Sequence, residues 1–421
     1  MSRTPEARAA HSPWKPVGAT GRPLPAWATD ATLGIFVHWG TYSVPAWAEP
    51  SGALGAVPDD EWFAHNAYAE WYANTIRIPG SPAADHHVRE YGGAPYEAFL
   101  DAWRAEAYDP ADWARLFAAV GADYVVPTTK HHDGVALWDA PGAGDRTTVA
   151  RGPARDLIGP LADAVRAEGL RFGVYYSGGL DWAVTDFPPH RSTADLERFR
   201  PKDAAYHAYA ARQVADLVER YRPDVLWNDI DWPDAGKAPG LGSLDALIAR
   251  YREAVPDGIV NDRWGADVWD YRTSEYDAHT GNEAEPGWEH CRGLGFSFGF
   301  NRVEDASLTL SPRELARLYA DVVSRGGRLL LNVGPTAAGE IPAVQRRTLE
   351  GAAGWLTAVK PHTAGRGPVA ADGVETDAAW WRAWATPEHV VVVVDGPGAS
   401  VRVGDDVLAG REAIVVPLPA A

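Results

Sequence analysis

Short apolar stretches recur along the chain, and each ends in polar or aromatic residues before a helical pattern or a loop begins. Stretches that are apolar on both faces are typical of parallel strands buried on both sides. They predict eight strands, at Leu33–Gly40, Asp123–Lys130, Arg171–Gly179, Asp224–Asp231, Gly258–Trp264, Ser274–His279, Gly295–Phe300 and Gly327–Pro335.

Amphipathic helices separate several of these strands. Asp109 and Pro110 supply an N-cap and a first helical residue for one of them. Ser311 and Glu314 have the spacing of a capping box for another, and the stretch LDALIARY carries a third apolar stripe. Alternating strands and helices predict an α/β fold with an irregular (β/α)8-type barrel, because no convincing helix appears between Trp264 and Phe296. A doubly wound open sheet is the structural alternative.

The pattern of hydrophobic and polar residues changes after Lys360. The segments EHVVVVVDG, SVRVGDD and EAIVVPL are short, rich in β-branched residues and separated by glycine-rich turns. This pattern predicts a small antiparallel β module. We therefore expect a catalytic (β/α)8-like barrel domain at residues 1–360 and a small C-terminal β domain at residues 361–421.

Composition narrows the class of protein. The 421 residues carry a formal net charge of −18, which makes nucleic acid and anionic membranes unexpected partners. Cys291 is the only cysteine, so an internal disulfide and cysteine-based zinc sites are excluded. The sequence shows neither the apolar segment of a signal peptide nor a transmembrane stretch. We expect a cytoplasmic protein, and the sequence leaves its oligomeric state open.

The stretch VVPTTKHHDGVALWD, from Val125 to Asp139, places two adjacent histidines and Asp133 at the end of a predicted buried strand. Functional groups of a parallel barrel collect at the carboxyl ends of its strands. The corresponding positions in this chain are His38, His131, His132, Tyr175, Trp227, Asp229, Arg263, His279 and Asn332.

This set favours a sugar site over a metal site. Adjacent residues such as His131 and His132 point to opposite faces of a regular strand, so they are poorly placed to chelate one ion. No HExxH motif completes a metal site. Sugars, by contrast, need several fixed hydrogen-bonding groups and aromatic rings for their C–H faces.

Glycoside hydrolysis needs two carboxylates flanking the scissile bond. Asp229 and Asp231 share a face of their predicted strand, and the segment GNEAEPGWEHCRG adds Glu283, Glu285 and Glu289. A turn-forming aspartate and a surface glutamate are the ordinary alternatives for these residues. Composition alone does not decide between a catalytic role and these ordinary roles.

Several motifs resemble the α-L-fucosidases of glycoside hydrolase family 29. They run from about Leu33 to Pro342 and read GIFVHWGTYSVPAW, EWYA, KHHDGVALW, RFGVYYSGGLDW, DVLWNDIDWP, VNDRWG, GWEHCRGLGFSFGFNR and LLLNVGPTAAGEIP. The number of motifs and their shared order make the resemblance specific.

The resemblance implies a retaining, exo-acting α-L-fucosidase that needs no cofactor and works through a covalent fucosyl-aspartate. Asp229 matches the family's nucleophile and Glu289 matches its acid/base. Glu70 is the second candidate for the acid/base role. Fucosylated oligosaccharides or glycoconjugates are the implied substrates. The implied sugar-binding residues are His38, Glu70, Trp71, His131, His132, Tyr175, Trp227 and Arg263, and Phe36 is a candidate contact for the C5-methyl of fucose.

Two features depart from the family pattern. Asp231 stands where the family often has glycine, and it either raises the pKa of Asp229 or points to solvent. The region from about Pro361 to Ala421 is shorter than the usual β-sandwich. The rival functions are a retaining glycosidase for another sugar such as an α-L-galactoside, a carbohydrate-binding protein without turnover, and a metal-dependent isomerase.

Overall fold

The computed structural model describes residues 19–277, 287–363, 366–369, 373–396, 398–404 and 412–420. Eight parallel strands form one curled sheet in the order β5-β4-β3-β2-β1-β8-β7-β6. They are β1 (Leu33–Val37), β2 (Tyr124–Lys130), β3 (Arg171–Ser177), β4 (Val225–Asp229), β5 (Ile259–Val260), β6 (Thr273–Glu275), β7 (Glu289–Gly293) and β8 (Arg328–Val333).

The edge strands β5 and β6 approach each other, which bends the sheet toward a closed barrel. They are joined by the isolated parallel bridge between Asn261 and Tyr271. Next to it, the Asp270 backbone N–H donates to the Val260 carbonyl at 2.8 Å, and the Val260 N–H donates to the Asp270 carboxylate at 2.9 Å. This confirms the predicted irregular (β/α)8-type fold.

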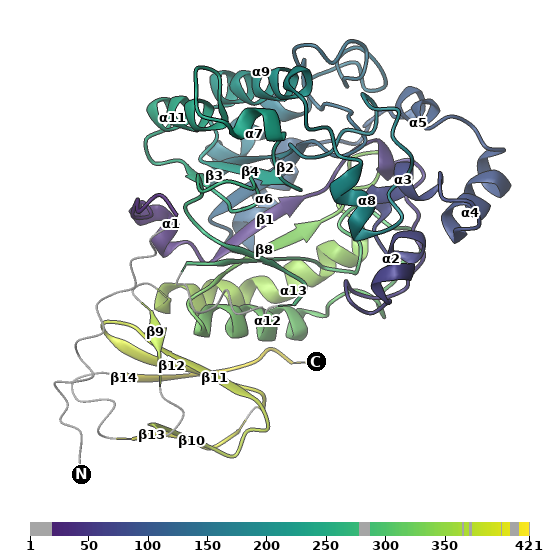
Figure 1. Ribbon diagram of the computed structural model, residues 1–421. Helices are drawn as coiled ribbons and strands as arrows, with labels where there is room; N and C mark the ends of the chain where they lie inside the picture. Colours follow the sequence, from purple (N-terminus) through teal and green to yellow (C-terminus); the bar gives the residue numbers. More distant parts are fainter. Residues whose placement is uncertain are drawn as a thin grey trace.

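Long helices cover the outside of the sheet (Figure 1). They are α6 (Pro110–Ala119), α7 (Ile158–Ala167), α9 (Ala204–Tyr221), α11 (Leu244–Ala254), α12 (Pro312–Ser324) and α13 (Ala343–Val359). The predicted helix starts are confirmed: the Asp109 side chain caps α6, and Ser311 with Glu314 forms the capping box of α12. No helix occurs among the described residues between Trp264 and Phe296, as predicted.

Shorter helices gather on the side toward which the arrows of β1 and β8 point (Figure 1). This side holds the carboxyl ends of the strands. Within the described residues, no helix is long and apolar enough to span a bilayer. The other helices among the described residues are α1 (Ala26–Asp30), η2 (Thr41–Ser43), α2 (Asp59–His65), η3 (Ala69–Trp71), α3 (Tyr72–Thr75), α4 (Pro82–Tyr91), α5 (Glu97–Ala102), α8 (Thr193–Arg198), α10 (Asp234–Lys237) and η5 (Lys360–His362).

The C-terminal strands form two small sheets, ordered β14-β12-β11-β9 and β10-β13. The pairs are antiparallel, as predicted, except that β14 joins β12 in parallel. Trp384 is fully buried and belongs to the same apolar core as the barrel, so the module packs against α12 and α13. The strands are β9 (Gly367–Pro368), β10 (Val374–Thr376), β11 (Trp381–Ala385), β12 (His389–Val394), β13 (Val401–Val403) and β14 (Glu412–Pro417).

One predicted strand is wrong, and the error matters for the site. Gly295–Phe300 is a loop, and the seventh strand lies just before it at Glu289–Gly293. The sequence EHCRG reads as polar, but the Glu289 and Cys291 side chains are buried inside the sheet. Glu289 is therefore the first residue of β7 and lies at the amino end of the strand.

Candidate active site

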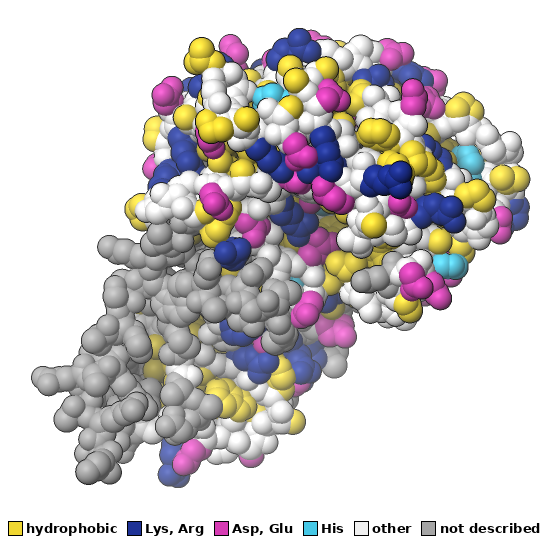
Figure 2. All heavy atoms as spheres, viewed as in Figure 1, with side chains coloured by type: hydrophobic (Ala, Val, Ile, Leu, Met, Phe, Trp, Pro, Cys, Tyr) yellow, Lys and Arg dark blue, Asp and Glu magenta, His cyan; other side chains and the backbone are white. Residues whose placement is uncertain are grey.

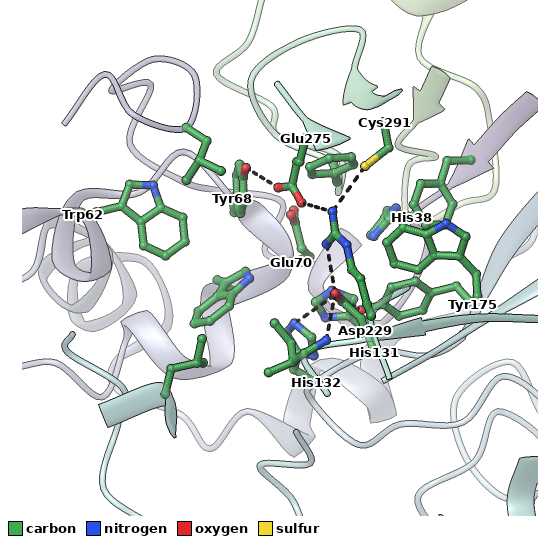
Figure 3. A pocket seen from close by; sticks show the side chains of 18 of the residues that line it. His38, Trp62, Tyr68, Glu70, His131, His132, Tyr175, Asp229, Glu275 and Cys291 are labelled. Carbon is green, nitrogen blue, oxygen red and sulfur yellow. Dashed lines mark hydrogen bonds and ion pairs between the residues drawn. The ribbon is translucent and has the colours of Figure 1, made fainter. Parts of the chain in front are cut away.

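A pocket of about 230 Å³ opens at the carboxyl ends of the strands (Figure 3). This is below the roughly 300–1,000 Å³ of pockets that hold drug-sized ligands, and it suits a single sugar ring. The pocket brings together all the predicted sugar-binding residues and Asp229. Its lining residues are Phe36, His38, Leu54, Trp62, Phe63, Tyr68, Glu70, Trp71, His131, His132, Tyr175, Thr193, Leu196, Trp227, Asp229, Ile230, Arg263, Glu275, Cys291 and Phe298.

Asp229 is the last residue of β4, and two side chains hold its carboxylate. The Tyr175 hydroxyl donates to Oδ2 at 2.8 Å, and Arg263 Nη1 donates to Oδ1 at 3.0 Å. His132 Nε2 lies 3.7 Å from Oδ2. Burial alone would raise the pKa of Asp229, but the charge of Arg263 and the hydrogen bonds from Arg263 and Tyr175 lower that pKa overall. The carboxylate is therefore ionised at neutral pH.

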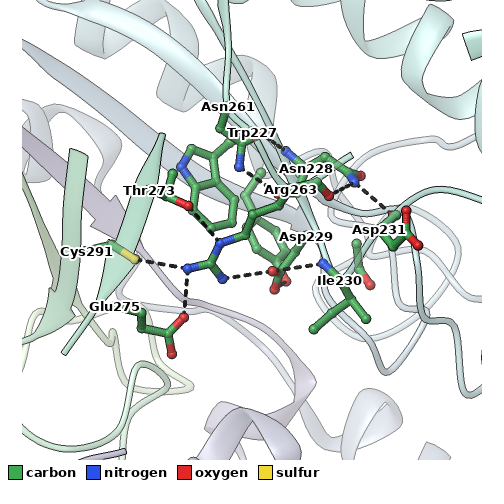
Figure 4. Close-up of polar contacts among 12 residues, drawn as sticks. Trp227, Asn228, Asp229, Ile230, Asp231, Asn261, Arg263, Thr273, Glu275 and Cys291 are labelled. Carbon is green, nitrogen blue, oxygen red and sulfur yellow. Dashed lines mark hydrogen bonds and ion pairs between the residues drawn. The ribbon is translucent and has the colours of Figure 1, made fainter. Parts of the chain in front are cut away.

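Arg263 connects Asp229 to a second carboxylate, Glu275 (Figure 4). Its Nη1 binds Asp229 while Nη2 donates to Glu275 Oε2 at 2.9 Å. The Arg263 Nε donates to the Thr273 hydroxyl at 3.1 Å, which fixes the plane of the guanidinium. Burial would lower the pKa of Arg263, but Glu275 and Asp229 raise it well above its usual value. The permanently charged guanidinium of Arg263, which we call the Arg263 fork, thus places the carboxylates of Asp229 and Glu275 side by side in the pocket.

Glu275 is a candidate functional side chain that the sequence pattern missed. It ends the three-residue strand β6 and also accepts a hydrogen bond of 2.8 Å from the Tyr68 hydroxyl. Its side chain is 19% exposed, so the carboxyl group reaches solvent. The signal was present, because Glu275 lies within the predicted strand Ser274–His279. His279, chosen as the tip of that strand, lies outside the described residues, as do Glu283 and Glu285.

The histidines of the pocket are neutral hydrogen-bonding groups. Burial lowers the pKa of His38 to about 4 and that of His132 to about 3. The Asn332 amide donates to the Phe298 carbonyl, which turns its oxygen toward His38 Nδ1 at 2.7 Å. The His38 ring therefore donates from Nδ1 and leaves Nε2 as an acceptor.

His132 has the same arrangement. The Ser177 hydroxyl donates to the Leu180 carbonyl, so His132 Nδ1, 2.7 Å from that hydroxyl oxygen, is the donor of their bond. Its Nε2 is left to accept a hydroxyl beside Asp229. Burial also lowers the pKa of His131 well below its usual value. Among the described residues, no group of three or more His, Cys, Asp or Glu side chains is arranged to hold a metal ion.

Aromatic rings form the inner wall. Tyr175 stacks between His131 at 5.5 Å and Trp227 at 5.5 Å, as measured between ring centroids. Phe36 packs edge-on against His38 at 4.6 Å. Such rings offer apolar faces to the C–H groups of a sugar.

Glu70 lies on η3, and residues of the loop after β7 bind one oxygen of its carboxylate. Its Oε2 accepts hydrogen bonds from the Gly299 N–H at 2.7 Å and the Ser297 hydroxyl at 3.3 Å. Burial raises the pKa of Glu70 to about 7, although these two hydrogen bonds act in the opposite direction. Trp71, the next residue, packs against His132 with ring centroids 5.4 Å apart.

Asp231 turns away from Asp229. Its carboxylate pairs with Arg200 at 3.0 Å and with Lys237 at 2.6 Å. Its φ of 113° lies in the region that favours glycine, which fits the residue common at this position in the resembled family. The first predicted effect, a raised pKa of Asp229, does not apply, because that pKa is lowered overall. The second applies in part, because the ion-paired Asp231 side chain lies outside the pocket and is 21% exposed.

The structure corrects the assignment of Glu289 as the acid/base. Its side chain is fully buried at the amino end of β7 and does not line the pocket. It accepts hydrogen bonds from the Trp227 indole at 2.8 Å and the Tyr124 hydroxyl at 2.5 Å, and pairs with Arg328 at 3.3 Å. Trp227 therefore stands between Glu289 and the pocket, and Glu289 is a structural partner of Arg328.

Replacing Glu289 with Gln should destabilise the fold and spare the chemistry. The change leaves the buried Arg328 charge unpaired, which costs ~3–5 kcal/mol of unfolding free energy. Denaturant titration measures this loss, and disaccharide hydrolysis per folded molecule should stay near that of the parent protein. A stable variant that has lost disaccharide hydrolysis would return the acid/base role to Glu289.

A barrel pocket for one sugar, with two carboxylates held by one arginine, defines the class of the protein as a glycoside hydrolase. The family model described as α-L-fucosidase matches residues 2–360. The chain belongs to the α-L-fucosidase family, glycoside hydrolase family 29, and is an α-L-fucosidase.

Individual relatives agree with this assignment. The chain is 32% identical to an α-L-fucosidase of Dictyostelium discoideum, over 80% of this chain and 70% of the relative. It is 34% identical to the tissue α-L-fucosidase of Bos taurus, over 80% and 68%. A Thermotoga maritima α-fucosidase in complex with fucose is similar in structure, with a TM-score of 0.77, 45% identity and coverage of 86% of this chain and 81% of that one.

Proposed function

We propose that the protein removes terminal α-L-fucose from glycosides with net retention, through a covalent fucosyl-aspartate. The observation that carries this proposal is the Arg263 fork, which binds Asp229 and Glu275 on neighbouring nitrogens at 3.0 and 2.9 Å. Retaining glycosidases hold their two carboxyl groups roughly 5–5.5 Å apart, closer than inverting enzymes do. Two carboxylates that bind the same guanidinium lie close together, which fits the shorter carboxyl separation of a retaining enzyme.

In the first step, the ionised Asp229 attacks the anomeric carbon while Glu275 donates a proton to the departing oxygen. Tyr175 and Arg263 hold the attacking carboxylate in place. His38 and His132 offer neutral Nε2 acceptors to sugar hydroxyls. General acid help of this kind contributes ~10²–10⁴-fold in rate.

In the second step, Glu275 takes a proton from water, which hydrolyses the ester on Asp229. Glu275 suits both steps because its side chain reaches solvent and neighbours Asp229 on the same fork. Glu70 is 2% exposed, and one of its oxygens is held by Gly299 and Ser297. We therefore assign Glu70 to sugar binding. The cytoplasmic location, the lack of a cofactor and the lack of nucleic-acid or membrane partners stay predictions of the sequence.

Phe36 and Phe298 supply an apolar contact for the C5-methyl group of fucose. Both rings line the pocket, with centroids 6.4 Å apart. α-L-Galactose differs by a hydroxyl on that methyl carbon, and such a group in an apolar contact costs ~1–3 kcal/mol.

An aryl α-L-fucoside should therefore be hydrolysed ~10–200-fold faster than the matching α-L-galactoside, in terms of kcat/KM. The two rates measured on one enzyme preparation test the sugar specificity. Equal rates would overturn fucose as the preferred sugar, and no hydrolysis of either compound would overturn the proposed function.

A further inference from the structure

One loop of the chain supports three different groups of the pocket. Residues 295–300 follow β7, and we call them the Phe298 loop because the Phe298 ring lines the pocket. The Gly299 N–H of this loop donates to the Glu70 carboxylate at 2.7 Å. The Phe298 carbonyl accepts from the Asn332 amide at 2.7 Å, and Asn332 in turn orients a histidine of the pocket. The backbone of the loop thus sets the positions of an aromatic ring, a carboxylate and a histidine.

The Phe298 loop depends on side chains for its backbone hydrogen bonds, because it forms neither a helix nor a strand. The Glu304 Oε1 atom accepts hydrogen bonds from the Phe296 N–H at 2.9 Å and from the Ser297 N–H at 2.8 Å. The Tyr276 hydroxyl donates to the Phe296 carbonyl at 2.6 Å. Buried backbone groups need partners of this kind. Glu304 supplies two of them with a single oxygen.

The Glu304 carboxyl group points toward the loop. On the face of the molecule shown in Figure 2, carboxylates lie at the surface among Lys and Arg side chains. Glu304 is instead half-buried and packs against Gly295, where an added Cβ atom would collide with its Oε2. Burial raises the pKa of Glu304 to about 8, although the two hydrogen bonds from the loop act in the opposite direction. The carboxyl group is therefore mostly protonated at neutral pH, and glutamine matches it in shape and charge.

The position of the Phe298 ring bears on one part of the sugar only. The ring centroid lies 4.9 Å from that of His38 and 6.4 Å from that of Phe36. L-Fucose carries a methyl group on C5 where L-galactose carries a hydroxymethyl group, and the two sugars share all other substituents. Groups that bind the shared hydroxyls therefore act on both sugars alike, whereas an apolar contact at C5 favours fucose.

We propose that Glu304 is a positioning residue that determines the preference for fucose over galactose, although it does not itself line the pocket. By binding two N–H groups of the Phe298 loop, Glu304 fixes the Phe298 ring against the C5-methyl group of fucose. Without this support the loop shifts and the apolar contact opens, which weakens the binding of fucose and spares that of galactose. The proposal rests on the proposed function, because it takes Phe298 as a contact of that methyl group.

Glu304→Ala removes both hydrogen bonds and tests the proposal through a ratio. The ratio is kcat/KM for 4-nitrophenyl α-L-fucoside divided by kcat/KM for 4-nitrophenyl α-L-galactoside. It should fall by about 3- to 10-fold, a part of the ~10–200-fold preference that the apolar contact supplies. Because both substrates meet the same enzyme molecules, the ratio does not change when some of the enzyme is unfolded. Losses of hydroxyl binding through Glu70 cancel in it as well.

Three further variants complete the test. Glu304→Gln keeps an acceptor oxygen for both N–H groups, so its ratio should stay within about twofold of the parent value. Glu304→Asp draws the acceptor back by one methylene group and should lower the ratio, so the test survives if Glu304→Ala fails to fold. Asp305→Ala is the matched control, because it removes the neighbouring exposed carboxylate, which binds Ser307. It should leave the ratio unchanged.

A double variant shows whether Glu304 acts through the ring. Phe298→Ala should lower the ratio by itself, and adding Glu304→Ala should then change it by less than about twofold, because the two residues act as one unit. An unchanged ratio in Glu304→Ala and Glu304→Asp, or equal losses on both sugars, would reduce Glu304 to a structural role and overturn the proposal. Failure of the parent protein to hydrolyse the fucoside would instead overturn the proposed function.

Discussion

Asp229→Gly lowers kcat/KM for an aryl α-L-fucoside by on the order of 10⁴–10⁶-fold, the size of loss expected when a nucleophile is removed. The reason is that no ester can form, while Arg263, Tyr175 and the sugar-binding histidines remain in place. In the presence of azide, the space left by the carboxylate admits the anion, which attacks the anomeric carbon once. The expected product is the inverted β-L-fucosyl azide.

Asp231→Gly is a matched control for this prediction. It removes a carboxylate from the same turn, at a φ of 113° that glycine adopts without strain. Because Asp231 is paired with Arg200 and Lys237 outside the pocket, the variant should keep activity within a few-fold of the parent. A large loss in Asp231→Gly with little loss in Asp229→Gly would exclude Asp229 as the nucleophile.

Glu275→Gln loses ~10²–10⁴-fold in kcat/KM on a fucosyl disaccharide and far less on 4-nitrophenyl α-L-fucoside in the glycosylation step. The disaccharide needs a proton on its leaving oxygen, whereas nitrophenolate departs without one. The ratio of the two kcat/KM values is the measurement, because it cancels losses of fucose binding that both substrates share.

Glu70→Gln is the control for the acid/base assignment. As a sugar-binding residue, Glu70 should affect both substrates alike and leave their ratio unchanged. Burial raises the pKa of Glu70 to about 7, so this carboxyl loses its proton as the pH rises through neutrality. If Glu70 were the general acid, activity would fall over that range, and Glu70→Gln would remove the fall together with the disaccharide activity.

The sequence pattern predicted the barrel because its central strands are apolar on both faces. β2 and β8 are buried along their whole length, and the helices before β2 and β8 begin with side-chain caps that follow local rules. Local signals of this kind need no knowledge of the rest of the fold.

The site was predicted less completely, because two of its features depend on distant partners. Glu289 is buried next to Arg328, which lies 39 residues further along the chain, so EHCRG did not read as a strand. Glu289 therefore lies at the amino end of β7, away from the pocket, although the family resemblance implied an acid/base role for it. Glu275 lies on a three-residue strand, and its proximity to Asp229 arises only through Arg263.

The most direct test of the central claim is azide trapping with Glu275→Gly and 4-nitrophenyl α-L-fucoside. In this variant Asp229 still displaces the nitrophenolate and forms the fucosyl ester, because that leaving group needs no acid. Azide then enters the space left by Glu275 and attacks the ester. NMR of the product should show α-L-fucosyl azide, the retained anomer. The β-azide, or no azide product at all, would contradict the assignment of Asp229 as nucleophile and Glu275 as acid/base.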